Sequence, residues 1–252
     1  MSVMEALKAS MEDMESVPPF LRALIYGTYG VGKTVLSMQL AQALCPADKT
    51  ILYIDYAEGF TVLRNPEFIK LTQGVKRMKY KGISQLKAIG QNHSTELLKN
   101  VGVVVVDETS AMATDALRSI CRERAKNDSS KDPDTPTQPD MNTATNLIYS
   151  AVQSLHSGPW HVIHVTHERK DKDDRQIEVV SPGFMPALQV QICRDMSVIA
   201  CVKTDLPKDG EAAVRSILTQ PTRRTVAKSR VTMDTLATPE KFITALERIY
   251  NV

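Results

Sequence analysis

The sequence predicts an α/β fold with a mostly parallel, twisted sheet flanked by helices and with antiparallel strands near the carboxyl terminus. An apolar stretch at 20–27 is followed at once by a glycine-rich loop and a helical pattern. A second stretch at 101–106, which is almost entirely valine, ends in two acids, as a buried central strand does. Strands that alternate with helices in this way form parallel sheets.

Composition limits the possible classes of protein. The chain has 252 residues and is 42% hydrophobic, which is enough for a full core. We expect a helix and linker at 1–19, followed by a single domain at 20–252. The net charge of +2 neither indicates nor excludes a nucleic-acid partner. The four cysteines lack C-x-x-C spacing, and no apolar run approaches 18 residues, so we expect a reduced, cytoplasmic protein without a membrane segment.

The loop after the first strand has the pattern Gly-x4-Gly-Lys-Thr, with a strand before it and a helix after it. This is a P-loop in the context that supports the assignment. Its glycines let the backbone approach a polyphosphate, and the following helix N-terminus points amides at anionic oxygens. Lys33 can reach the β- and γ-phosphates, and the Thr34 hydroxyl can ligate Mg2+. The predicted nucleotide-binding residues are Gly27, Thr28, Tyr29, Gly30, Val31, Gly32, Lys33, Thr34 and Val35.

One acid in the first half of the chain is expected to act together with the P-loop. The strand at 101–106 ends in Asp107, and the carboxyl ends of parallel strands share one edge of a sheet. A P-loop protein needs a second acid there to hold the Mg2+ shell, so we predict Asp107 and Thr34 as the metal-side pair. The other elements expected in this half are helices at 1–15, 32–44 and 84–100, and a strand at 50–56 that carries Asp55 and precedes Glu58.

A basic cluster lies in the less regular stretch at 60–90, which includes Lys76, Arg77 and Lys79. Such a run is usually a solvated face, and the alternative is contact with a nucleic acid or a phosphate.

The second half begins with a helix at 109–126 and continues with a segment rich in Asp, Pro, Ser and Thr at 127–140, for which we expect a mobile loop or lid. The charged stretch at 168–183 is also expected to be an exposed, mobile loop. The remaining elements expected are helices at 141–156, 184–193 and 239–250, strands at 160–166, 196–204, 213–218 and 225–231, and a hairpin turn at 208–210.

Three histidines on the strand at 160–166 and just after it suggest a metal site. However, alternation places His164 on the opposite face from His161 and His167. The outer two would lie roughly 20 Å apart at about 3.3 Å per residue, which argues against zinc. We expect His161 and His164 to be structural and His167, at the carboxyl end of the strand, to lie near the nucleotide.

Together the P-loop unit, the D-x-x-E-G end of the next strand, the VVVVDE strand and the strand ending in T-H-E resemble the RecA-like ATPases. The closest resemblance is to phage-borne, RecA-core annealing or recombination proteins of the Sak type, over about residues 20–235. The resemblance implies a RecA-like P-loop NTPase core that binds ATP and Mg2+ between neighbouring subunits. It also implies single-stranded DNA gripped by loops, a homo-oligomeric ring or filament, a single-strand-binding protein as a further partner, and a location in the host cytoplasm.

The same resemblance assigns roles to acids and to a histidine. Glu58 lies where the family keeps the carboxylate that activates water, although this chain has D-x-x-E where RecA has a tighter D-x-E. Asp55 and Glu108 therefore stay open as the catalytic base. His167 falls at the position of the γ-phosphate sensor, which in RecA is usually Gln.

Two sets of cations are also matched by the resemblance. The stretch 168–181 corresponds to a DNA-binding loop, with Arg169, Lys170 and Arg175 as its candidates. Lys228 and Arg230 resemble the K-x-K with which a RecA-type subunit reaches its neighbour's phosphate. A solvated edge strand guarded by basic residues is the alternative for this pair.

Three function classes follow from these observations. The resemblance favours an ATPase, stimulated by DNA, that acts in annealing or recombination. The near-neutral charge favours a loader or motor that acts on a protein, as in helicase loading or packaging. The third class is a nucleotide-gated scaffold that binds ATP without turnover. An ATPase assay with and without single-stranded DNA separates them.

Overall fold

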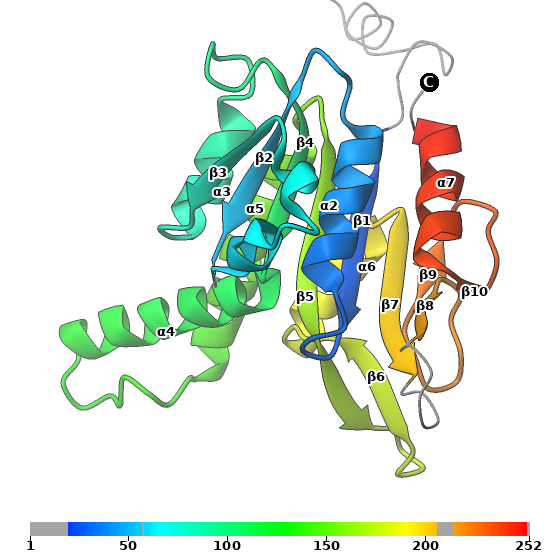
Figure 1. Ribbon diagram of the computed structural model, residues 1–252. Coiled ribbons are helices and arrows are strands. Elements are labelled where there is room, and N and C mark those ends of the chain that lie inside the picture. Colours follow the sequence, from blue (N-terminus) through cyan, green and yellow to red (C-terminus); the bar gives the residue numbers. More distant parts are fainter. Residues whose placement is uncertain (1–19, 57, 206–213, 251–252) are drawn as a thin grey trace, which may run out of the picture.

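The computed structural model describes residues 20–56, 58–205 and 214–250. Over these residues the chain forms a ten-stranded sheet with helices on both faces (Figure 1). The predicted α/β fold class is therefore confirmed. The helix expected at 1–15 and the turn expected at 208–210 lie outside the described residues.

The order of strands in the sheet is β10-β8-β7-β1-β5-β4-β2-β3, with β6 paired to β5 and β9 paired to β7. The strands from β7 to β3 in this order are parallel, and β8, β10, β6 and β9 pair antiparallel with their neighbours. The bounds are β1 Arg22–Gly27, β2 Thr50–Asp55, β3 Val75–Lys79, β4 Val101–Asp107, β5 His161–Lys172, β6 Glu178–Pro182, β7 Val198–Asp205, β8 Val214–Leu218, β9 Lys228–Ser229 and β10 Leu236–Ala237.

Two layers of helices cover the sheet. Helices α2 and α7 lie on one face, and α3, α4, α5 and α6 lie on the other (Figure 1). No helix in the described part of the chain is long and apolar enough to span a membrane. The helix bounds are α2 Lys33–Leu44, α3 Ile83–Gln91, α4 Thr109–Asn127, α5 Gln138–His156, α6 Pro186–Asp195 and α7 Pro239–Tyr250, with short 3-10 turns η1 Gly59–Arg64 and η2 Ile69–Thr72.

The register of the parallel strands brings distant parts of the sequence to one edge. Gly27 is opposite His167 in the β1–β5 pair, and Asp55 is opposite Asp107 in the β2–β4 pair. Strand β4 is buried along its whole length, which its valine run predicts. The P-loop, both aspartates and the histidine therefore lie at the carboxyl edge of the sheet, where open α/β sheets bind their ligands.

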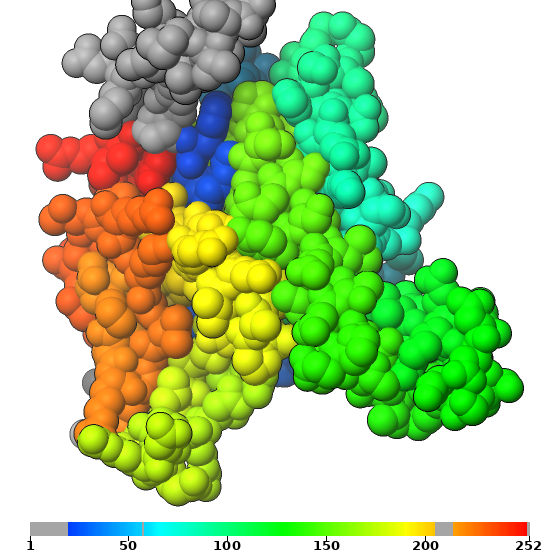
Figure 2. All heavy atoms as spheres, turned by 180° about the vertical axis from the view of Figure 1, so that it is seen from behind, coloured from blue at the N-terminus to red at the C-terminus, as the bar shows by residue number. Residues whose placement is uncertain are grey.

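The charged stretch after His167 is not an irregular loop, so that expectation is wrong. Strand β5 continues to Lys172 and pairs antiparallel with β6 from Glu168 opposite Pro182 to Lys172 opposite Glu178. Seen from behind, the atoms of this hairpin form the lower end of the molecule (Figure 2). Its backbone hydrogen bonds, rather than an apolar pattern, define these strands, and for that reason the sequence did not reveal them.

Other elements also differ from expectation: the strand expected at 225–231 is only β9, and β10 was not expected. Strand β3 was not predicted, because its sequence VKRMK carries three exposed cations at the edge of the sheet. Helix α3 ends at Gln91 rather than at residue 100, with the Asn92 amide and side chain both bonded to the Ala88 carbonyl. At Gly90 this helix packs so closely on α5 that a Cβ would overlap Ser154.

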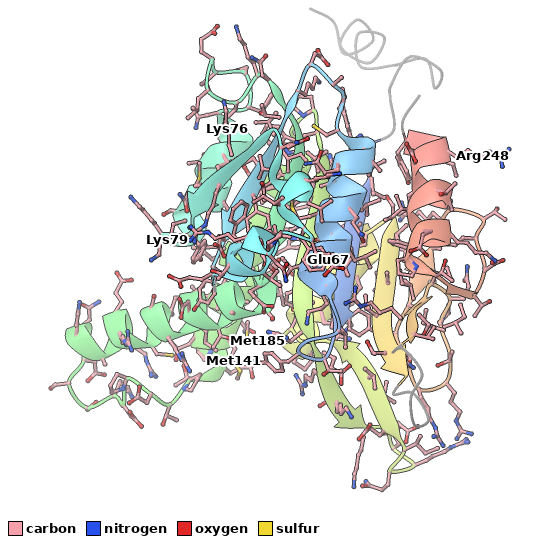
Figure 3. All side chains as sticks on the ribbon, in the orientation of Figure 1. Glu67, Lys76, Lys79, Met141, Met185 and Arg248 are labelled. Atoms are coloured by element: carbon pink, nitrogen blue, oxygen red, sulfur yellow. The ribbon has the colours of Figure 1, made fainter. Side chains whose placement is uncertain are left out.

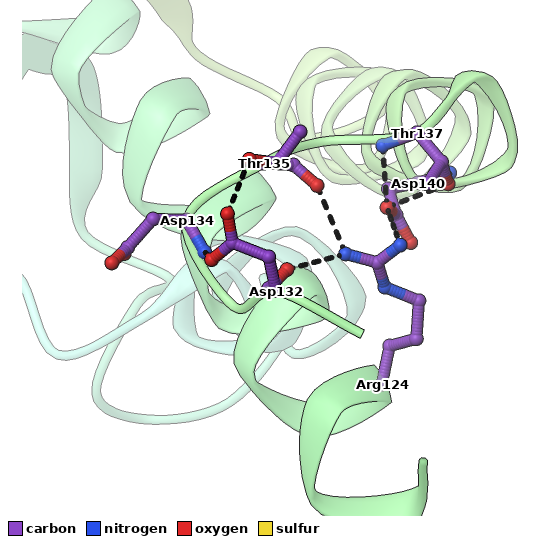
Figure 4. A network of polar contacts seen from close by, with 6 residues as sticks. All are labelled: Arg124, Asp132, Asp134, Thr135, Thr137 and Asp140. Carbon is purple, nitrogen blue, oxygen red and sulfur yellow. Dashed lines mark hydrogen bonds and ion pairs between the residues drawn. The ribbon is translucent and has the colours of Figure 1, made fainter. Parts of the chain in front are cut away.

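The loop between α4 and α5, predicted as a mobile lid, is held by its own hydrogen bonds (Figure 4). Arg124 donates to the carbonyls of Asp132 and Thr135 at 2.9 and 3.0 Å, and its Nη1 lies 3.3 Å from Asp140 Oδ2. Thr137 and Asp140 form a capping box at the start of α5. The loop lies at the end of α4 that is distant from the P-loop (Figure 1), so it does not cover the carboxyl edge.

Candidate active site

The P-loop follows β1 and uses glycines where a side chain would clash or strain the backbone. A Cβ at Gly27 would lie 2.5 Å from the Val202 carbonyl, and Gly30 and Gly32 have φ of +77° and +87°. Helix α2 then begins at Lys33 with no side chain capping its first turn and no acid in that turn. Its free amides and the positive end of its dipole are therefore available to an anion.

Lys33 is buried within the loop that it follows. Its Nζ donates to the Gly27 carbonyl at 3.1 Å and to the Thr28 carbonyl at 2.8 Å. Burial lowers the pKa of Lys33, while Glu108 and Asp107 act in the opposite direction. The two carbonyls thus hold the ammonium group at the mouth of the loop, where a nucleotide phosphate would meet it.

Asp107 ends β4 and is 2% exposed. Its Oδ2 accepts hydrogen bonds from Thr34 Oγ1 at 3.3 Å and from the Tyr53 hydroxyl, and its Oδ1 has no hydrogen-bond partner among the described residues. Burial raises the pKa of Asp107 to about 6, against the hydrogen bond from Tyr53. The carboxylate is thus pre-positioned beside the hydroxyl with which it would share a cation.

The residues present fit a magnesium ion held jointly with a nucleotide. In the described part of the chain no three His, Cys, Asp or Glu side chains cluster closely enough to hold a metal without help. Mg2+ instead typically binds one or two protein oxygens and substrate phosphates, and keeps several waters. The Thr34 hydroxyl and the unpaired Asp107 oxygen supply this kind of donor set.

Glu108, His167 and Lys33 form a chain of close contacts. Glu108 Oε2 lies 2.8 Å from His167 Nε2, although the alignment is not that of a hydrogen bond, and His167 Nδ1 lies 3.3 Å from Lys33 Nζ. The Tyr29 ring lies against the imidazole at an interplanar angle of 35°, with centroids 3.7 Å apart. A carboxylate, an imidazole and an ammonium group therefore meet where the γ-phosphate and its attacking water are expected.

The other two candidate bases are placed differently. Asp55 is buried, and its Oδ2 lies 2.6 Å from Arg77 Nη2, so its charge is already paired. Glu58 is exposed, but the next residue, Gly59, packs so closely on Asp107 that a Cβ there would overlap the carboxylate. The geometry thus favours Glu58 and Glu108 over Asp55 as the base.

The other histidines have structural contacts. The His161 ring accepts a hydrogen bond from the Leu21 amide at 3.0 Å. His164 is fully buried between Thr109 at 3.2 Å and His156 at 3.1 Å, and burial lowers its pKa to about 3. Burial also lowers the pKa of His161, to about 4, so both rings stay neutral at pH 7.

Lys228 and Arg230 do not reach the active site of their own chain. They lie by the amino-terminal end of β7, because β9 pairs Lys228 with Ile199. Lys228 Nζ donates to the Cys193 and Arg194 carbonyls at 3.1 and 2.8 Å, and Arg230 donates to the Arg194 carbonyl at 3.4 Å. These carbonyls belong to the end of α6, where cations are favourable.

The predicted DNA-binding cations are divided between two sites. Lys76 and Lys79 project from the edge strand β3 (Figure 3), whereas Arg77 on the same strand is engaged by Asp55. The other three lie on the β5–β6 hairpin, where Arg169 pairs with Asp171 at 2.8 Å and Lys170 pairs with Glu178 at 3.3 Å. Arg175, which is exposed, lies near the tip of the hairpin.

Two residues at the site were not found from the sequence. Tyr53 supports Asp107 from β2, and only the register between β2 and β4 reveals it. Arg215 on β8 reaches the P-loop. A Cβ at Gly32 would lie 2.8 Å from Arg215 Cζ. No local pattern marks it, because it is far along the chain and becomes a neighbour only through the antiparallel return of β8.

The comparison with protein families agrees with this geometry. Residues 20–231 match a family model described as an AAA domain, which covers β1 through the end of the segment that follows β9. Among curated proteins none matches the chain. The family implies a nucleotide as ligand, typically with Mg2+, and the loop, Lys33 and the Asp107–Thr34 pair are arranged for that ligand. The chain belongs to the AAA domain family of P-loop ATPases.

Proposed function

We propose that the chain is a Mg-ATP-dependent ATPase that binds single-stranded DNA and acts as an oligomer in annealing or recombination, as the phage-borne RecA-core proteins of the Sak type do. Residues 20–252 would work as a single ATPase domain, and a single-strand-binding protein would be a further partner. One continuous sheet and the placement of the P-loop, Asp107 and His167 at its carboxyl edge support this proposal.

The observation that carries the DNA part is a pair of adjoining hollows beside the nucleotide site. One, of about 400 Å3, is lined by Tyr29, His167, Arg118, Arg169 and Tyr56, among others. Aromatic faces and cations along one groove are what sequence-tolerant single-strand binding requires, because bases stack and phosphates pair.

The second hollow, of about 550 Å3, shares Tyr56 with the first and continues to Tyr80 and Lys81. The rings of Tyr56 and Tyr80 lie 5.5 Å apart. Asp115 lines both hollows, Glu168 lines the first and Glu123 lines the second, so the lining is not uniformly basic. A strand in this groove would pass His167, which gives a direct route by which DNA could affect hydrolysis.

The test is the ATPase rate with and without single-stranded DNA, together with the salt dependence of binding. Each phosphate contact should contribute roughly 0.7 log units of affinity per log unit of salt. Arg118→Glu should flatten this slope and reduce stimulation, with basal ATPase retained. The control is Arg122→Glu, an exposed cation one turn further along α4 that lines neither hollow.

Charge reversal on the hairpin tests the contacts expected from the resemblance. The variant Arg169→Glu/Lys170→Glu/Arg175→Glu should weaken DNA binding and leave basal ATPase intact. Binding that is unaffected by salt, by Arg118→Glu and by these changes would contradict the DNA proposal.

A second candidate function is a motor or loader that acts on a protein. Residues 168–178 of the hairpin contain five acids and four cations, so the hairpin is not a basic arm. Its own ion pairs also neutralise Arg169 and Lys170. Turnover that DNA does not change would support this candidate, and tight ATP binding without any turnover would support a nucleotide-gated scaffold.

The oligomer belongs to the same proposal. We propose that Lys228 and Arg230 complete a neighbour's active site in trans, with their contacts at the end of α6 as the resting arrangement. Arg230 is exposed and Lys228 is half-buried, so their release would cost the hydrogen bonds that they donate to these carbonyls. A role confined to the end of α6 is the alternative, and it predicts a loss of stability without a loss of ATPase activity.

A further inference from the structure

Arg215 lies on β8, opposite Thr204 of β7, near the carboxyl edge of the sheet. Strand alternation places its side chain on the same face as Ile217, which packs with α2 and α7 in the core. Its guanidinium reaches the start of α2. A Cβ at Gly32 would lie 2.8 Å from Arg215 Cζ and 3.0 Å from both Nε and Nη1.

Arg215 is exposed, and its guanidinium lies beside other positive charge. The N-terminus of α2 carries a partial positive charge, and Lys33 is the next residue after Gly32. Within the described residues no carboxylate lies at ion-pair distance from Arg215. Glu240 lines the same hollow of about 480 Å3 beside Gly30, but it forms no ion pair with the guanidinium.

We propose that Arg215 is a further phosphate-binding residue of the nucleotide site and acts on the ATP bound to its own chain. The inference rests on the nucleotide-binding role of the P-loop. Helix amides, Lys33 and the Arg215 guanidinium would then all contribute to binding one polyanion. An arginine fork suits phosphate oxygens, since it can donate two parallel hydrogen bonds.

Glycine at position 32 is favoured by its φ of +87°, and it leaves room for the Arg215 guanidinium beside its Cα. This contribution in cis is separate from the one proposed for Lys228 and Arg230, which lie by the other end of β7 and would act on a neighbour.

The experiment measures equilibrium binding of fluorescent ATP, ADP and AMP, with Mg2+, to the full chain and to Arg215→Ala and Arg215→Lys. Loss of a charge-assisted contact should weaken ATP binding by roughly 10- to 100-fold in Arg215→Ala. Arg215→Lys keeps the charge without the fork and should recover part of the affinity. AMP, with only one phosphate, should lose less than ATP.

The matched control is Lys203→Ala. Lys203 is an exposed cation on the neighbouring strand β7, on the opposite face of the sheet from Arg215, so its removal should leave ATP binding unchanged. Thermal unfolding of each variant shows whether it is folded. Arg215→Ala with wild-type or tighter ATP binding overturns the inference, and tighter binding identifies the guanidinium as a plug that ATP must displace.

The inference and the function on which it rests fail in different ways. If the wild type binds no nucleotide, the nucleotide site itself is wrong. If the wild type binds ATP, Lys33→Ala loses it and Arg215→Ala does not, then the P-loop functions as proposed and only the role of Arg215 is rejected.

Discussion

Replacing Asp107 by asparagine should stabilise the nucleotide-free protein while it abolishes Mg2+-dependent turnover. The carboxyl group is 2% exposed, and one of its oxygens has no hydrogen-bond partner among the described residues. Burial raises its pKa from 3.8 to about 6. The folded state therefore disfavours the ionised form that predominates at pH 7. Asparagine has nearly the same shape, is neutral, and keeps an oxygen to accept the hydrogen bond from Tyr53.

The size of the effect follows from the pKa shift. A rise from 3.8 to about 6, at 1.36 kcal/mol per pKa unit, corresponds to about 3 kcal/mol at pH 7. Because the folded-state pKa is the higher one, the favourable contribution of this group is fully present below pH 3.8 and is lost as the pH rises through about 6. The advantage of Asp107→Asn should thus be largest above pH 6 and shrink as the pH falls toward 3.8.

The assay is thermal or urea unfolding of both proteins without nucleotide and with a chelator, at pH 7 and at pH 4.5. At pH 7 we expect the Tm of Asp107→Asn to be higher by about 5–10 °C. The control is Asp174→Asn, an exposed acid on the hairpin, which should change Tm little. Saturating Mg-ADP should stabilise the wild type more than the variant, because the cation neutralises the buried charge. A variant that is no more stable at pH 7, or equally stabilised at both pH values, would refute the reasoning.

Two other predictions concern the reacting groups. Glu108→Gln keeps the size of the side chain but removes its basicity, so this variant should bind ATP with kcat lowered by about 100-fold or more. Glu58→Gln should lower kcat less. If Glu58→Gln has the larger effect, the base is Glu58. Subunits that carry Lys228→Ala and Arg230→Ala should regain part of the ATPase activity when they are mixed with Lys33→Ala subunits. Subunit exchange must be demonstrated first. No recovery would reject the contribution in trans, and a lower Tm of the double variant with intact ATPase would assign these cations to the end of α6.

The sequence predicts those parts of the fold whose pattern is set by burial. Strand β4 is one apolar run that ends in Asp107, and α2 follows the P-loop over nearly the residues expected. These elements lie in the core, so their hydrophobic pattern is strong. The P-loop is also predictable, because phosphate binding requires glycines and Lys33 at fixed spacing.

Elements stabilised mainly by backbone pairing are hidden from such patterns. Strand β3 carries Lys76 and Lys79 on exposed positions, and the hairpin has charged residues on both of its strands. In both cases the ladder of backbone hydrogen bonds exists only after a neighbouring strand is in place. A polar edge also protects a sheet from pairing with another chain, so its sequence resembles that of a loop.

Contacts between distant residues are the other part that the sequence does not contain. The Tyr53 hydroxyl meets Asp107 only through the β2–β4 register, and Arg215 meets Gly32 only because β8 returns beside β7. The partners of Lys228 follow from the placement of α6. Each requires the tertiary arrangement before any local rule applies.

The backbone is strained at the two candidate bases, Glu58 and Glu108, at the carboxyl edge of the sheet. Glu58 and Glu108 have φ of 59° and 66°, in the left-handed region that glycine occupies most readily. For a non-glycine residue this conformation costs roughly 1 kcal/mol or more. Each acid immediately precedes the element that follows its strand, η1 or α4, and Glu108 contacts His167 from this position. Glycine would relieve the strain and remove the carboxylate. The strain at these two acids and the raised pKa of Asp107 are what we expect of an edge arranged for a metal ion and phosphates.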